Sequence, residues 1–316
     1  MSNRSRLFTL AAALIGALAA LFIWESRREP RTLRLRRFRV HLPGLPSGLA
    51  GTRIAFLSDF HVNGPGHGNE LTPLALDLVR REDPDLLLLG GDYFDHSRCH
   101  QHACLFDRLR EFALVFGILG NHDLHRRGRY SGAIVKELGS RGVPVLWNRA
   151  ERVALRGGEI TIAGVGDPYI GYADPREALQ GTAEPRILLA HAPSIVERLP
   201  PGAAALVLAG HTHGGQIRLS PFDRLTPLDS TWWLDRLFRH PPQRFLRGFH
   251  WVNGTLLYVS HGIGTTRLPL RFLAPPEAVL IELVASAPHP EEPCDQAARY
   301  VEELPSATHQ PGEEDR

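Results

Sequence analysis

The stretch AAALVLAGHTH, residues 203–213, is an apolar run that ends at a glycine and is followed at once by two histidines. Short apolar runs bounded by glycine or polar residues are typical of buried strands. We therefore expect a strand at 203–209 that delivers His211 and His213 to its C-terminal end. The pair is a weak signal alone, because the two rings could also be ordinary residues of an extended strand.

The same arrangement recurs at four other places in the chain. The runs are RIAFL (53–57), DLLLL (85–89), LVFGIL (114–119) and RILLA (186–190). The polar residues that follow them are Asp59 and His61, Asp92 and Asp95, Asn121, His122 and Asp123, and His191. Each group alone has an ordinary explanation, such as a turn or a core histidine. Five groups together favour one shared site.

Helical patterns separate some of these runs. Residues 71–81 and 131–140 each place apolar side chains on one helical face, and a further apolar run, TLLYV, covers 255–259. Strands that alternate with helices predict an α/β layered sheet, in which ligands gather beyond the C-terminal strand ends. Several buried carboxylates and imidazoles at that edge require a counter-charge, which metal cations supply.

Composition narrows the chemistry further. The 316 residues are 43% hydrophobic and 22% charged, which excludes a disordered chain. There are 16 histidines and 3 cysteines, so a metal site would use imidazole and carboxylate and not thiolate. The net charge of +2 and the lack of a long basic stripe in the folded part argue against nucleic acid as a partner.

The series Asp59-x-His61, Gly91-Asp92-x-x-Asp95, Gly120-Asn121-His122-Asp123, His191 and Gly210-His211-Thr212-His213 resembles the calcineurin-like metallophosphoesterase superfamily over roughly 52–284. The stretches at 210–219 and 262–283 resemble a bacterial membrane-associated branch. That branch includes UDP-2,3-diacylglucosamine hydrolases of lipid A synthesis and related phosphodiesterases. The resemblance implies an α/β fold built as a four-layer α/β/β/α sandwich.

The resemblance also implies a role for each site residue. Two divalent metal ions, Mn, Fe or Zn, are expected, with no organic cofactor. The first metal would be held by Asp59, His61, Asp92 and His213. The second metal would be held by Asp92, Asn121, His191 and His211. His122 would stabilise the phosphoryl charge or protonate the leaving oxygen, with Asp123 orienting its ring. Asp95 is interpreted as a helix N-cap or as an acceptor behind the ligands, not as a ligand.

The two ends of the chain are interpreted separately. Leu7–Trp24 is an uncharged apolar run with two arginines before it and seven between 27 and 39, which favours a single-pass inner-membrane anchor with a cytoplasmic catalytic domain. A signal peptide cleaved near Ala17–Ala19 is the alternative. We expect an anchor at 1–26, a basic juxtamembrane linker at 27–51, a catalytic domain at 52–285 and a disordered tail at 286–316.

The resulting hypothesis is a membrane-anchored phosphoesterase that hydrolyses a phosphodiester or pyrophosphate. The first substrate to consider is UDP-2,3-diacylglucosamine. The alternative is a general phosphodiesterase or phosphomonoesterase acting on other envelope or nucleotide phosphates. Expected partners are thus a phosphoester, with or without acyl chains, and membrane lipid. A scaffold without activity is a third interpretation, but no expected ligand is missing.

Two further features are weaker. The histidines and cysteines between His96 and Cys104 are interpreted as a solvated loop and not as an extra metal site. Ser230–Trp251 mixes aromatic residues with arginines, which suits either a membrane or lipid contact or an insertion packed on the sheet.

Overall fold

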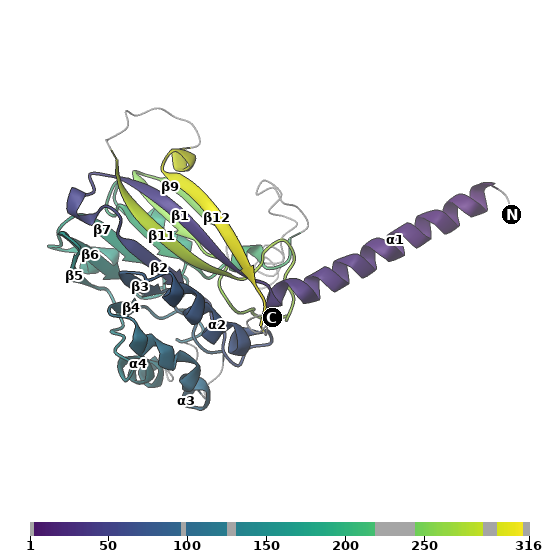
Figure 1. Ribbon diagram of the computed structural model, residues 1–316, viewed down its shortest axis with the longest axis horizontal. Coiled ribbons are helices and arrows are strands. Elements are labelled where there is room, and N and C mark those ends of the chain that lie inside the picture. The colour runs from purple at the N-terminus through teal and green to yellow at the C-terminus, as the bar shows by residue number, and fades with distance from the viewer. Residues whose placement is uncertain (1–2, 96–98, 125–130, 219–243, 287–295, 312–316) are drawn as a thin grey trace.

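A computed structural model of the protein describes residues 3–95, 99–124, 131–218, 244–286 and 296–311. Two six-stranded sheets form its centre (Figure 1). The strands of the first sheet are β1 (Leu33–Pro43), β2 (Arg53–Leu57), β3 (Leu86–Leu89), β4 (Val115–Gly117), β11 (Glu277–Ser286) and β12 (Val301–His309). They are ordered β12-β1-β11-β2-β3-β4.

The second sheet has the order β5-β6-β7-β8-β10-β9. Its strands are β5 (Arg149–Leu155), β6 (Gly158–Gly164), β7 (Arg186–Leu189), β8 (Leu206–Ala209), β9 (Gly248–Val252) and β10 (Thr255–Val259). In the first sheet β2, β3 and β4 are parallel, and in the second sheet β6, β7, β8 and β10 are parallel. The C-terminal ends of each parallel set therefore lie at one edge, as the sequence predicts.

Three apolar clusters produce the four-layer α/β/β/α arrangement that we expected. Between the sheets, side chains of β2 and β3 such as Phe56 and Leu88 pack in one buried cluster with Ile187 and Leu208 of the second sheet. The outer face of the first sheet is covered by α2 (Gly68–Arg81), η3 (Ala103–Glu111) and α4 (Ser131–Gly139), with α3 (Cys99–His102) beside them. The outer face of the second sheet is covered by α5 (Pro175–Leu179) and η4 (Pro193–Arg198).

The linker expected at 27–51 is wrong where β1 forms. In β1 the leucines, phenylalanine and valine are buried and the arginines between them are less buried. Leu33 and Leu35 pack in the cluster under the helices, and Phe38, Val40 and Leu42 pack between the sheets, so this segment is a strand of the core. β1 lies between two neighbours, pairing in parallel with β11 and antiparallel with β12. Four of the seven arginines assigned to the juxtamembrane region, Arg34, Arg36, Arg37 and Arg39, therefore belong to the sheet.

The disordered tail expected from 286 is also wrong over the residues that form η7 (Gln296–Arg299) and β12. The tail is too polar to build a core, but an edge strand needs only one paired side. Glu303 pairs with Arg36 at 2.9 Å and Glu302 with Arg39 at 3.6 Å, and the Tyr300 ring stacks on Trp251 at 4.5 Å. Acidic residues of the tail thus balance the basic face of β1.

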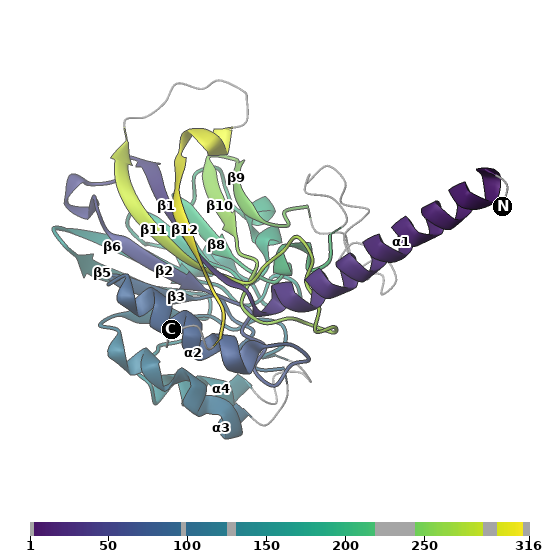
Figure 2. The ribbon, with the colours of Figure 1, turned by 45° about the vertical axis from the view of Figure 1, so that its right-hand side comes forward.

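One helix in the described part of the chain is long and apolar enough to span a membrane. It is α1 (Asn3–Arg28). Its apolar stretch has a mean hydropathy of 2.4, and none of that stretch is buried. Figure 2 shows α1 projecting from the body as a rod, with only its C-terminal end against the folded part. A single-turn helix, η1 (Glu29–Arg31), joins α1 to β1.

Candidate metal centre

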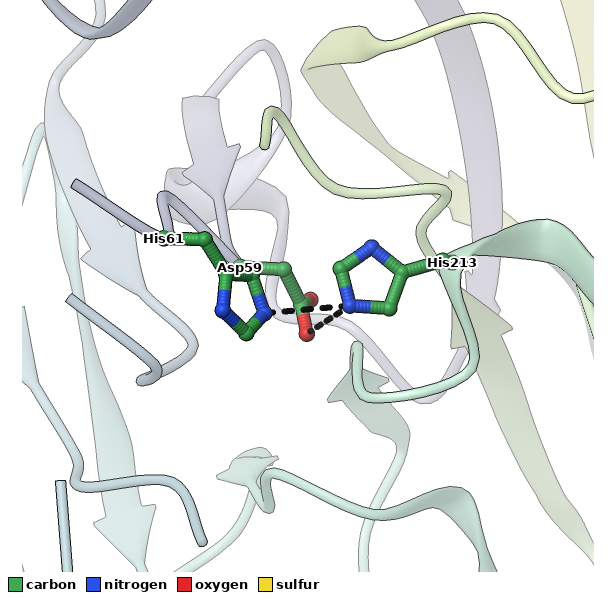
Figure 3. Close-up of side chains that lie close together, drawn as sticks. All are labelled: Asp59, His61 and His213. Carbon is green, nitrogen blue, oxygen red and sulfur yellow. Dashed lines mark hydrogen bonds and ion pairs between the residues drawn. The ribbon is translucent and has the colours of Figure 1, made fainter. Parts of the chain in front are cut away.

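The loops that follow β2 and β8 bring three predicted ligands together (Figure 3). Nε2 of His61 lies 3.1 Å from Nε2 of His213, and Oδ1 of Asp59 lies 3.7 Å from the same His213 atom. All three side chains are buried. Their donor atoms converge closely enough to hold one ion.

Asp92, which follows β3, lies beside this group and beside a second one. Its Oδ2 is 3.5 Å from Nε2 of His61 and 3.1 Å from Nε2 of His191. Oδ1 of Asn121 lies 3.1 Å from Nε2 of His191 and 2.9 Å from Nδ1 of His211. The seven residues predicted as ligands therefore lie together where the C-terminal ends of parallel strands from both sheets come close, with Asp92 between the two groups.

The backbone at this edge is unusual. Five of the seven residues have positive φ angles, between 44° and 72°, a region that side chains other than glycine rarely adopt: Asp59, His61, Asp92, His211 and His213. Such conformations cluster at functional sites. The glycines beside them allow close approach, since a Cβ at Gly120 would lie 2.2 Å from Oδ1 of Asp92 and one at Gly210 would lie 2.1 Å from Oδ2 of Asp59.

Burial and neighbouring charges shift the pKa values of the site in opposite directions. Burial alone would raise the pKa of Asp92, but the nearby His191 and His122 hold it well below its usual value. Burial opposes charge on His191, but Asp92 raises its pKa well above the usual value. Burial and the charge of His191 lower the pKa of His211 to about 3, and burial and His61 lower that of His213. Neutral imidazoles such as these offer lone pairs to a cation.

His122 is held by a different carboxylate from the one we expected. Nδ1 of His122 lies 2.8 Å from Oδ1 of Asp95, and Asp95 also contacts Nδ1 of His61 at 2.5 Å. Asp95 thus acts as an acceptor behind the predicted ligands, which is one of the two roles expected for it from the sequence; the other was a helix N-cap. Burial opposes charge on His122, but Asp92 and the bond to Asp95 raise its pKa to about 9.

Asp123 does not have the role that we expected from the sequence. Its carboxylate is fully buried and accepts backbone N–H bonds from Gly120 (2.9 Å), Asp92 (2.8 Å) and Tyr93 (2.9 Å). It therefore fixes the loops after β3 and β4, and Asp95 orients the His122 ring. Sequence order suggested Asp123 because it is adjacent to His122. Asp95 lies in the loop after β3, which is held beside the His122 loop by the N–H of His122 donating to Oδ1 of Asp92 at 2.8 Å.

Two residues of the site, Asp167 and Tyr169, were not predicted from the sequence. Both lie just beyond β6, which was not predicted either, although its ITIAGVGD sequence carries the same signal of an apolar run followed by glycine and aspartate. Asp167 is buried, and burial raises its pKa to about 6. The Tyr169 ring lies 4.4 Å from the ring of His211.

The residues present fit a dinuclear metal centre. Carboxylate and amide oxygens combined with imidazole nitrogens suit Mn, Fe or Zn, and the choice among them is not set by the donor types. Within the described ranges, the clusters able to hold an ion consist of Asp and His alone. Cys104 is exposed and lies outside these clusters. The loop expected between His96 and Cys104 is wrong from Cys99 onward, where α3 and the start of η3 form, and 96–98 lie outside the described residues. Most of Ser230–Trp251 also lies outside them, and its end forms part of β9.

Comparison with known proteins agrees with this geometry. Residues 52–215 match the sequence profile of the family described as calcineurin-like phosphoesterase. The chain belongs to this family. As a calcineurin-like phosphoesterase it is a metal-dependent hydrolase of phosphoric esters, and the Asp and His clusters described above are its candidate dimetal site.

Several proteins resemble this phosphoesterase over most of their length. The uncharacterized metallophosphoesterase YkuE of Bacillus subtilis is 32% identical over 90% of this chain and 98% of that protein. The phosphodiesterase YaeI of Escherichia coli is 31% identical over 90% of this chain and all of that protein. The UDP-2,3-diacylglucosamine pyrophosphatase LpxG of Chlamydia trachomatis is more distant, at 26% identity over 86% of this chain and 96% of that protein.

Proposed function

We propose that this phosphoesterase is a membrane-anchored phosphodiesterase or pyrophosphatase with a dinuclear metal centre. The observation that supports the proposal most directly is the convergence of seven oxygen and nitrogen donors around Asp92. When bound there, two divalent cations activate a water for attack on phosphorus and neutralise the phosphoryl oxygens.

The side chains of the site have separate roles in metal binding and proton transfer. Asp59, His61, Asp92 and His213 would hold the first cation, and Asp92 would be shared with the second. Asn121, His191 and His211 would complete the second site. His122 is only partly buried, so its ring can meet the substrate, and it protonates the leaving oxygen. Asp95 keeps Nδ1 of that ring in place.

The substrate to test first is UDP-2,3-diacylglucosamine, cleaved at its pyrophosphate. The likeness to LpxG and the unburied apolar helix α1 both support a lipid-linked substrate. Full-length protein in detergent with Mn²⁺ should release UMP from this compound. Absence of UMP, with brisk hydrolysis of bis(p-nitrophenyl) phosphate, would exclude this substrate and leave the enzyme class intact.

A second candidate is a general phosphodiesterase or phosphomonoesterase acting on other envelope or nucleotide phosphates. The likeness to YaeI, named a phosphodiesterase, favours it. A panel of soluble mono- and diesters, tested beside the lipid-linked pyrophosphate on the same protein preparation, ranks the two candidates by kcat/KM.

The side of the membrane is part of the same proposal. α1 serves as a retained anchor, and exposed Arg27, Arg28 and Arg31 follow its apolar stretch, which supports a cytoplasmic catalytic domain. Alkaline phosphatase fused after residue 316 should then be inactive in cells, since that reporter works only after export. An active fusion would place the catalytic domain outside and favour envelope phosphates.

A further inference from the structure

The loop between β10 and β11 carries exposed apolar side chains close to the body end of α1. We call residues 265–273 the anchor loop. Leu268 and Leu273 are 47% and 37% exposed, and Pro269 between them is also exposed. Single exposed apolar residues are ordinary, but two in one short loop beside an unburied apolar helix are a local concentration.

The anchor loop is bonded directly to the end of α1. The backbone N–H of Arg271 donates to the carbonyl of Ser26 at 3.0 Å, and the Phe272 ring lies 4.8 Å from that of Phe22. The carboxylate of Glu29 accepts the N–H of Leu273 at 2.9 Å. The loop is therefore fixed beside the point where the apolar helix meets the body, and Figure 2 shows that this end alone touches the body.

The same loop is bonded to the metal centre. The guanidinium of Arg271 is fully buried, donates to the carbonyls of His261 (2.8 Å) and Gly264 (2.5 Å), and lies 3.3 Å from Nδ1 of His213. The N–H of Gly264 in turn donates to the carbonyl of Asp59 at 2.7 Å. Arg271 of the anchor loop thus contacts the predicted ligand His213 directly and is connected to the predicted ligand Asp59 through Gly264.

A second connection runs through Gln216, three residues after His213. Its side-chain amide donates to the carbonyls of Thr266 (2.9 Å) and Leu268 (3.1 Å), and its side-chain oxygen accepts the N–H of Thr266 at 3.2 Å. The anchor loop cannot move relative to the His213 segment without breaking these bonds. The metal centre and the end of α1 are therefore held at a fixed separation.

We propose that the anchor loop is a second membrane contact, which inserts Leu268 and Leu273 into the bilayer face from which α1 emerges. The metal centre then lies at the level of the lipid headgroups. The preferred substrate is a phosphoester carried by a membrane amphiphile, whose phosphorus is presented at that level. This substrate class rests on the function proposed above, whereas the membrane contact of the loop does not.

The contact is tested by lipid quenching on the full chain. An environment-sensitive fluorophore is attached at Leu268→Cys, and in a separate protein at Val135→Cys, after Cys99, Cys104 and Cys294 are replaced by Ser. Val135 is a matched control, because it is similarly exposed on α4 in the outer helical layer. In phosphatidylcholine and phosphatidylglycerol vesicles, lipids with a shallow nitroxide should quench the probe at 268 at least threefold more than the probe at 135. Equal quenching would overturn the proposal.

The consequence for substrate choice is tested with two diesters. Wild type, Leu268→Ser/Leu273→Ser and Val135→Ser are compared on hexadecyl p-nitrophenyl phosphate in vesicles and on soluble bis(p-nitrophenyl) phosphate. The ratio of vesicle-borne to soluble turnover should fall at least fivefold in the double variant and stay within twofold in Val135→Ser. A constant ratio would contradict the substrate class. If wild type cleaves neither diester nor UDP-2,3-diacylglucosamine, the proposed function fails, and the quenching experiment still decides the loop contact.

Discussion

Oδ1 of Asp95 lies 2.8 Å from Nδ1 of His122. The same oxygen lies 2.5 Å from Nδ1 of His61, so one carboxylate orients both a predicted metal ligand and the predicted proton donor. The two rings are nearly perpendicular, with centroids 4.7 Å apart. Asp95 therefore couples the metal site to the leaving-group side, although it contacts neither the metal nor the substrate in our assignment.

Replacement of Asp95 should impair both metal binding through His61 and proton donation by His122. In Asp95→Asn, we expect metal affinity or kcat/KM on bis(p-nitrophenyl) phosphate to fall by about 10–100-fold, the usual effect of removing a partner behind a metal ligand. Metal content per chain and kinetics measure the two effects. Glu159→Gln is the control, because Glu159 forms an ion pair with Arg152 in which both side chains are exposed. Wild-type behaviour of Asp95→Asn would refute the orienting role.

Substitution of Asp123 should mainly lower the stability of the fold, whereas substitution of its neighbour His122 should mainly lower the rate of hydrolysis. Asp123→Ala leaves three buried N–H groups without an acceptor, so the free energy of unfolding of the metal-free protein should fall by about 3 kcal/mol. His122→Ala should change that free energy by less than about 1 kcal/mol and lower kcat by about 10²–10⁴-fold. Urea unfolding and steady-state kinetics provide the two measurements. A large loss of kcat in Asp123→Ala without a loss of stability would show that Asp123 has a catalytic role after all.

Removal of metal should abolish hydrolysis reversibly. Dialysis against EDTA should stop turnover with little loss of secondary structure, since the two sheets are held by apolar clusters outside the site. Mn²⁺, Fe²⁺ or Zn²⁺ should restore it. In Asp92→Ala the activity should not return, because the carboxylate between the two clusters is gone. Turnover of Asp92→Ala above background would disprove the shared bridging role.

The parts of the site that the sequence predicted share one property: they follow apolar runs directly. The run at 53–57 becomes β2 with the same bounds, and the run at 203–209 shortens to β8 but still ends before His211 and His213. Parallel pairing brings the C-terminal ends of such strands together, so the position of each residue after an apolar run was enough to predict that it belongs to the site. The partner of His122 was not predictable, because a contact between the loops after β3 and β4, and not sequence adjacency, brings Asp95 to the ring.

The sheet edge near the chain ends was not predictable for a different reason. The arginines after α1 resemble a membrane flank and the acidic tail resembles a disordered segment, as long as each is considered alone. Their ion pairs appear only when β1 and β12 lie side by side. Charge complementarity between segments this far apart cannot be inferred from either composition.

Loss of β12 should destabilise the first sheet. A chain that ends at Ser286 loses the antiparallel pairing with β1, the Arg36–Glu303 ion pair and the Tyr300–Trp251 stack. We expect its melting temperature to fall by about 5 °C or more, since each 1 kcal/mol lost lowers it by about 2–4 °C in a domain of this size. A chain ending at Gln310 keeps all three and should melt like the full protein. Equal melting of both chains would show that β12 adds nothing.

Glu277 should make stability depend on pH. It is buried, accepts the Tyr258 hydroxyl at 2.7 Å and the N–H of His261 at 2.9 Å, and lies 3.4 Å from Arg36. Burial would raise its pKa, but His261 and Arg36 lower it below the usual 4.5. Its ionised form therefore stabilises the fold above about pH 4.5, and this contribution is lost as the pH falls toward the lowered pKa.

The comparison that isolates this contribution is Glu277→Gln. Thermal melts of both metal-free proteins between pH 3.5 and 7 should differ most at neutral pH and converge at the acidic end. His261, whose pKa burial lowers, faces the same carboxylate and is present in both proteins. A difference that stays constant across this range would exclude Glu277 as the titrating group.

The position of β1 also bears on how the protein is made. β1 is the first strand of the chain, but its partners on both sides are β11 and β12, the last two strands that the structure describes. Synthesis proceeds at roughly 5–20 residues per second, so β1 waits many seconds without a partner while its neighbours are translated. The apolar helix has already left the ribosome by then. In its proposed role as the anchor, α1 therefore reaches the membrane before the first sheet closes, and the catalytic domain completes its fold there.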